Sequence, residues 1–212
     1  MLSVVPQPTT GQFTERFAIG LSLDHLWSET MGMSERDKET VLTSLVDVLD
    51  DVGTPYAVMG GVAVQLYTEE PRTTADVDIA LHTRDDIPRG ELERRGFSYD
   101  GLHRWSENWR GPAPLGTPRK QRISVQFSAD DLMSASVDRA VPAQAGSLRL
   151  RLVTMEDLIL LKLAAAAESS RRASKRLQDL ADVTRLLEEH PGLDSQAIRG
   201  RLRTIRRSLP DK

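Results

Sequence analysis

The sequence predicts an α/β protein with a helical C-terminal region, because short strand patterns alternate with helical patterns until nearly everything becomes helical from Met155. Apolar and polar residues alternate over 75–81 and 122–128, which indicates half-buried strands. With 212 residues, the chain is long enough for one ordinary core and a small second lobe. We expect an N-terminal arm at 1–33, a core at 34–154 and a helical region at 155–212.

Composition supports a globular protein, since 39% of the residues are hydrophobic and 28% are charged. The net charge of −3 creates no overall basic field, so any polynucleotide contact would be local. The absence of cysteine excludes disulfides, zinc–thiolate sites and thiol nucleophiles. We see no signal-peptide pattern and no apolar run long enough to cross a bilayer. We therefore expect a cytoplasmic protein with no membrane partner.

The elements follow in order along the chain. Residues 1–33 mix small polar residues and prolines with isolated aromatics, which predicts a poorly ordered arm, or one that docks on the body or on a partner. Its docking residues would be Phe13, Phe17, Leu21, Leu26 and Trp27. A cap at Ser34 and apolar residues at helical spacing predict a helix that ends at Gly53. A buried strand at 56–59 and a helix at 62–67 come next.

The middle of the chain combines strands, turns and loops. Residues 85–95 predict a charged surface helix, and 97–105 predict a hairpin around Asp100-Gly101, a favoured turn pair. Three prolines and two glycines within 107–118 indicate a mobile loop. Residues 122–128 and 148–153 predict the last two strands.

Gly60-Gly61 and the aspartates at 76 and 78 are the candidate residues for binding phosphate and metal. Glycines between a strand and a helix allow backbone N–H groups to approach a phosphate, and the helix N-terminus adds partial positive charge. Asp76 and Asp78 lie two residues apart on a strand, so they point the same way and can hold one hard cation. Separately, each pattern is more often a tight turn or a solvated surface. Their order favours a site for phosphate and metal.

The runs MGGVA at 59–63 and RTTADVDI at 72–79 resemble the signature of the nucleotidyltransferase fold superfamily, and more narrowly that of AbiEii-type toxins. The resemblance implies a mixed β-sheet flanked by helices, with a helical C-terminal lobe. It further implies Mg²⁺ (or Mn²⁺) at Asp76 and Asp78 and nucleotide phosphates at Gly60 and Gly61. Arg72 and Thr74 would orient the loop or touch the triphosphate. The alternative for Arg72 is a surface pair with Glu69 or Glu70.

One position departs from the family pattern. These enzymes commonly carry a third carboxylate on a later strand, and the matching position here is Ser124. Alternation places Ser124 and Gln126 on the face where the acid belongs, and neither can act as a base. Three interpretations stay open: Asp130 or Asp131 supplies the acid, one metal suffices without a base, or the protein binds nucleotide without catalysis.

The helical region holds further candidates. Lys162 is the only charge within 158–167, so it either extends to solvent or reaches a phosphate or carboxylate. By resemblance, Lys162 faces the nucleotide, and Lys175 and Asp179 lie near the site. For Arg172 we favour an ion pair on a solvated helix. The basic tail at 199–212 is either a solvated terminus or a contact for RNA.

The expected function is Mg²⁺-dependent transfer of a nucleoside monophosphate from an NTP to an RNA, protein or small-molecule acceptor. Partners implied by the resemblance are the NTP, tRNA or a protein as acceptor, and an antitoxin, because such transferases occur as toxins of toxin–antitoxin systems. The competing hypothesis is a non-catalytic nucleotide-binding relative that lacks the third carboxylate.

Overall fold

The computed structural model describes residues 10–30, 38–70, 72–103 and 106–208. Within these ranges, seven strands form one mixed sheet in the order β3-β4-β5-β2-β1-β7-β6. Two neighbouring pairs, β2 with β5 and β1 with β7, run parallel, and the other neighbours run antiparallel. The strands are β1 (Tyr56–Met59), β2 (Asp76–Leu81), β3 (Ser98–Leu102), β4 (Ser106–Arg110), β5 (Ser124–Ser128), β6 (Val141–Ala145) and β7 (Leu148–Leu152). The predicted mixed sheet flanked by helices is confirmed.

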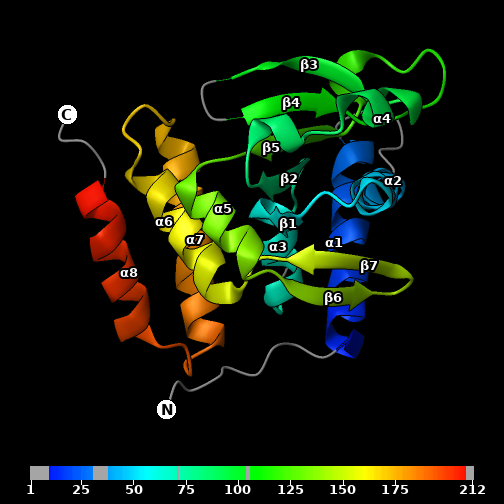
Figure 1. Ribbon diagram of the computed structural model, residues 1–212. Helices are drawn as coiled ribbons and strands as arrows, with labels where there is room; N and C mark the ends of the chain where they lie inside the picture. The colour runs from blue at the N-terminus through cyan, green and yellow to red at the C-terminus, as the bar shows by residue number, and fades with distance from the viewer. Residues whose placement is uncertain (1–9, 31–37, 71, 104–105, 209–212) are drawn as a thin grey trace.

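Helices cover the sheet on both sides in Figure 1, where α6, α7 and α8 lie together on the left and α1 and α2 lie on the right. Their bounds are α1 (Thr10–Thr30), α2 (Lys38–Val52), α3 (Gly60–Tyr67), α4 (Arg89–Arg94), α5 (Asp131–Asp138), α6 (Met155–Ala167), α7 (Ala173–Glu189) and α8 (Ser195–Ser208). Short 3-10 turns occupy Arg84–Asp86 and Arg119–Gln121. Within the described ranges, no helix is long and apolar enough to cross a membrane.

The central strands follow from their side-chain pattern. Val77 and Ile79 on β2 are fully buried, while Asp76 and Asp78, which alternate with them, are only half-buried. Val125 and Phe127 on β5 repeat the same alternation. The predicted alternating strands are therefore present, and their polar residues share one face of the sheet.

The N-terminal arm differs from a poorly ordered segment, because residues 10–30 form one helix. Phe13 and Phe17 anchor it in the core at 4% and 3% exposure. Leu26 and Trp27, expected to dock as well, are 58% and 51% exposed. The apolar residues of α1 do not form one continuous stripe, so the helix has only a short anchored face.

Two local predictions were wrong, and one strand was missed. The Asp100-Gly101 pair lies inside β3 at a register shift with β4, rather than at the hairpin turn. β4 occupies the start of the segment expected to be a loop, and β6 was not anticipated. Pro142 weakens the strand pattern of β6, which is tolerated because β6 is at the edge of the sheet. The Ser34 cap lies outside the described residues.

Candidate active site

The turn between β1 and α3 is built around two glycines that permit a close approach of β2. Gly60 has φ +65°, and a Cβ there would lie 1.9 Å from Oδ2 of Asp78. A Cβ on Gly61 would lie 2.2 Å from Oγ1 of Thr74. The backbone N–H of Gly61 donates to the Asp78 carboxylate. The glycines therefore bring the first turn of α3 against the carboxylate strand, as a combined phosphate and metal site requires.

Asp76 and Asp78 lie on the same face at the start of β2, and the register of the sheet places Asp78 opposite Met59. Burial is the largest cause that raises the pKa of Asp78, to about 6, and the negative charge of Asp76 raises it further. Lys162, the Gly61 amide and Arg171 act in the opposite direction. Two carboxylates held this close favour a shared cation, because a cation relieves both burial and repulsion.

The neighbouring strand offers no acid to this pair. β5 runs parallel to β2, with Ser124 opposite Asp76 and Gln126 opposite Asp78. Asp130 lies four residues beyond Gln126, about 13 Å along an extended chain, and its side chain accepts from the Met133 amide as the N-cap of α5. Among the described residues, no group of three His, Asp or Glu side chains is arranged to hold a metal. Asp131 lies one residue further along and is exposed at the start of α5. The structure thus disfavours a third acid from either Asp130 or Asp131.

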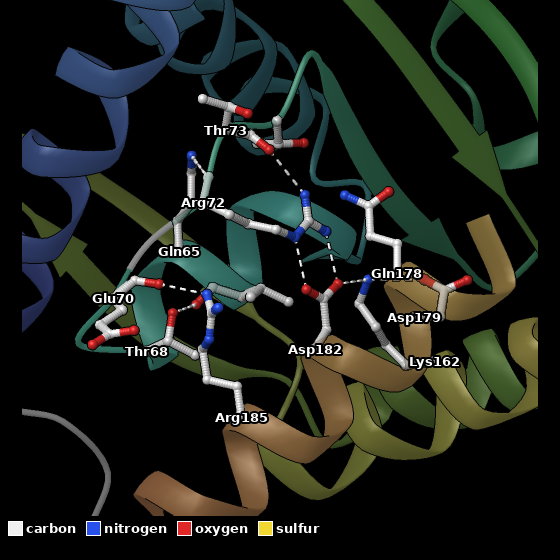
Figure 2. A network of polar contacts seen from close by, with 12 residues as sticks. Gln65, Thr68, Glu70, Arg72, Thr73, Lys162, Gln178, Asp179, Asp182 and Arg185 are labelled. Atoms are coloured by element: carbon white, nitrogen blue, oxygen red, sulfur yellow. Dashed lines mark hydrogen bonds and ion pairs between the residues drawn. The ribbon is translucent and has the colours of Figure 1, made fainter. Parts of the chain in front are cut away.

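An ion network joins α6 and α7 to the loop before β2 (Figure 2). Lys162 Nζ lies 3.0 Å from Asp179 and 2.6 Å from Asp182, and it is only 7% exposed. Arg72 donates twice to Asp182, each time at 2.7 Å. Burial opposes the charge of Asp182, but the hydrogen bonds from Arg72 hold its pKa below the ordinary value. Lys162 therefore reaches carboxylates rather than solvent.

The partner of Arg72 lies neither at Glu69 nor at Glu70, the two alternatives next to it in sequence. Asp182 is separated from Arg72 by 110 residues, so no local signal identifies the pair. Asp179 also accepts from Arg171 at 3.0 Å. Among the residues that the structure describes, the network thus contains three cations and two carboxylates, and two of these cations, Lys162 and Arg171, also act on the charge of Asp78.

A second polar cluster holds Thr74, and its members were missed in the sequence. Asp24 of α1 accepts from the Thr74 amide at 2.7 Å, and Lys38 of α2 donates to the Thr74 carbonyl at 3.0 Å. Lys38 also pairs with Asp24, and Gln65 donates to the same carboxylate at 3.1 Å. Burial lowers the pKa of Lys38, although Asp24 raises it. Together Asp24 and Lys38 fix both sides of the Thr74 peptide just before the carboxylate strand.

The other predicted residues lie at the edge of the site or away from it. Lys175 is exposed on α7 and contacts Gln178 at 3.5 Å. Arg172 is exposed as the N-cap residue of α7, as expected of a solvated position. Arg201 of the basic tail pairs with Asp157, which is fully buried, so this arginine has a structural partner.

A pocket of about 210 Å³ opens where α1, the start of β2 and the start of α7 meet. Arg72, Thr74, Asp76 and Lys175 all line it, so the structure brings these four predicted residues to one cavity. Further lining residues come from α1, from α2 and from the residue just before β5, namely Asp24, Trp27, Ser28, Lys38 and Ile123.

The fold defines the class of protein. It is similar to an antigenic nucleotidyltransferase-like protein from Paracoccidioides brasiliensis, with a TM-score of 0.53, 23% identity, and coverage of 82% of this chain and 88% of that chain. It is also similar to a putative nucleotidyltransferase from H. pylori, with a TM-score of 0.51, 20% identity, and coverage of 72% of this chain and 68% of that chain. For the antibiotic-resistance factor ANT(2″)-Ia the TM-score is 0.50 and the identity 14%, with coverage of 79% of this chain and 94% of that chain. The chain has the nucleotidyltransferase fold.

The family follows from the sequence of the second half. The family model described as nucleotidyl transferase AbiEii toxin, type IV TA system, matches residues 93–211, more than half of the chain. The chain therefore belongs to the AbiEii family of nucleotidyl transferase toxins and is a transferase enzyme. The matched segment includes Lys162 and Asp179, whereas the glycines and the carboxylates of β2 precede it. No curated protein sequence matches the chain.

Proposed function

We propose that the chain transfers a nucleoside monophosphate from an NTP to a hydroxyl acceptor and releases pyrophosphate. The observation that carries this proposal is the carboxylate pair Asp76 and Asp78, held against the first turn of α3 by Gly60 and Gly61. The pair supplies oxygen ligands, and the adjacent helix N-terminus favours an anion. The surrounding cations suit the charge of a triphosphate.

The donor set fits a divalent cation of the Mg²⁺ or Mn²⁺ kind, which binds through one or two carboxylates plus phosphate oxygens. The raised pKa of Asp78 supports this fit, because the cost of its negative charge falls when a cation is shared with Asp76. When bound, such a cation neutralises negative charge on the phosphates during transfer. Asp76 and Asp78 would hold it.

The ion network would provide the positive side of the site. Lys162 and Arg72 are both held by Asp182, so their charges are fixed in position before a nucleotide arrives. Arg171 and Lys175 extend the positive charge along the start of α7 toward the pocket. Thr74 would contact the triphosphate from the loop clamped by Asp24 and Lys38.

No side chain on β5 would take the proton from the acceptor hydroxyl, because the β5 residues opposite the two carboxylates are Ser124 and Gln126, and neither is a base. A missing base costs about 10²–10⁴-fold in rate. This observation favours one competing function, a relative that binds nucleotide but transfers it poorly.

We further propose that the protein acts as a toxin in the cytoplasm and that an antitoxin inhibits it. Its acceptor would be tRNA, a protein or a small molecule.

Label transfer tests the proposal. The protein is incubated with each α-³²P-labelled NTP, Mg²⁺ and, separately, total tRNA, a protein extract or an aminoglycoside. We expect label on one acceptor class, and no label with the double variant Asp76→Asn, Asp78→Asn. The matched control Asp131→Asn, an exposed acid on α5, retains transfer. Transfer that persists in the double variant refutes the site, and Mg²⁺-dependent binding without transfer selects the non-catalytic alternative.

A further inference from the structure

The pocket next to the carboxylate strand has one wall that the proposed chemistry does not use. That wall belongs to α1, where Trp27 lines the cavity together with Asp24 and Ser28. α1 is attached to the core at its other end by Phe13 and Phe17, which are 4% and 3% exposed. Trp27 is 51% exposed, so its indole is available to a ligand rather than committed to packing.

The α1 wall is fixed relative to the carboxylates. Asp24 lies three residues before Trp27, about one helical turn, and therefore on the same side of α1. Its carboxylate accepts from the Thr74 amide at 2.7 Å, two residues before Asp76. Buried Lys38 holds the same carboxylate and the Thr74 carbonyl. These contacts hold the α1 turn that carries Trp27 next to the strand that carries the proposed metal ligands.

The pocket offers two kinds of surface. Lys38, Arg72 and Lys175 contribute positive charge, and Asp76 contributes one of the proposed metal ligands. Trp27 and the buried Ile123 contribute flat and apolar surface. A nucleoside triphosphate has the complementary division, with a charged tail at one end and a planar aromatic base at the other.

We propose that Trp27 binds the nucleobase of the NTP by stacking its indole on the base. The inference rests on the proposed function, since it assumes that the triphosphate lies against Asp76 and Asp78. Gln178 of α7 lines the same pocket, beside Arg72 in Figure 2, and its amide can donate to or accept from the edge of the stacked base. Stacking itself discriminates little among bases, because every base has a π-face.

Calorimetric titration with two probes tests the proposal. Wild type, Trp27→Ala, Trp27→Phe and Leu26→Ala are titrated with each NTP, and with inorganic tripolyphosphate, which has no base, all in the presence of Mg²⁺. Leu26 is the matched control, because it is the neighbouring exposed residue on α1 and does not line the pocket. Thermal unfolding of each variant checks that the fold is retained.

We expect Trp27→Ala to weaken binding of at least one NTP by about 5- to 150-fold, the range for one base stacked on an aromatic side chain. Binding of tripolyphosphate should stay within about twofold, and Trp27→Phe should retain most of the NTP affinity. Unchanged NTP affinity in Trp27→Ala overturns the stacking proposal alone, as does an equal loss for NTP and tripolyphosphate. If wild type binds neither probe, the proposed function fails and stacking fails with it.

Discussion

Asp78→Asn is expected to stabilise the metal-free protein while it destroys the proposed metal site. Asp78 is half-buried next to Asp76, and burial followed by this repulsion raises its pKa to about 6 from an ordinary value of 3.8. The folded protein therefore binds this proton more tightly than the unfolded chain does. As the pH rises from about 4 to about 6, folding stability falls, because the folded state must release a proton that the unfolded chain has already lost.

The magnitude follows from the two pKa values. The difference between about 6 and 3.8 corresponds to about 3 kcal/mol of lost stability above pH 6 at 25 °C. Asparagine has no charge to bury and can still accept from the Gly61 amide. The variant should therefore exceed wild type by up to about 3 kcal/mol at pH 7, and the two should be nearly equal at pH 4.

Urea unfolding of chelator-treated protein, followed by far-UV circular dichroism at both pH values, measures this difference. Asp131→Asn serves as the control, because its exposed carboxylate should leave stability almost unchanged at either pH. Added Mg²⁺ should stabilise wild type and leave Asp78→Asn unaffected. The reasoning is refuted if Asp78→Asn is no more stable than wild type at pH 7, or if its advantage is the same at pH 4.

Three other substitutions test separate parts of the site. Lys162→Met leaves its two α7 carboxylate partners buried without their lysine, and should reduce the free energy of unfolding by about 3–5 kcal/mol in urea; a loss below about 1 kcal/mol would contradict the buried network. Lys38→Met removes a donor from Asp24 and should reduce the free energy of unfolding by about 1–3 kcal/mol, with weaker Mg²⁺ binding by calorimetry. Unchanged Mg²⁺ affinity would show that the contacts of Asp24 and Lys38 with Thr74 do not position the carboxylates. Ser124→Asp adds an acid opposite Asp76 and should raise the initial rate of label transfer up to about 10²-fold; an unchanged rate would show that a third acid is not what limits transfer.

The carboxylate strand could be predicted from the sequence because its signal is local. Alternation over residues 75–81 places the apolar side chains inward, so Asp76 and Asp78 follow on the other face. Alternation also placed Ser124 and Gln126 correctly, since the observed register puts them opposite the two acids. A period of two specifies the face of each residue without knowledge of the strand order.

The contacts around the site depend on pairs that are distant in sequence. Asp182 meets Arg72 across 110 residues, and Asp24 meets Thr74 across 50. α1 was not predicted because its helix is anchored mainly by two phenylalanines instead of a long apolar stripe. At Gly101 the register shift within β3 prevailed over the local turn preference of Asp100-Gly101.

The most direct test of the central claim is Mg²⁺-dependent NTP binding by wild type and by the double variant Asp76→Asn, Asp78→Asn. Isothermal titration with and without Mg²⁺ should show that the metal strengthens NTP binding to wild type at least tenfold. The double variant should retain the fold and lose this dependence on Mg²⁺. Equal metal dependence in both proteins would contradict the assignment of Asp76 and Asp78 as the metal ligands.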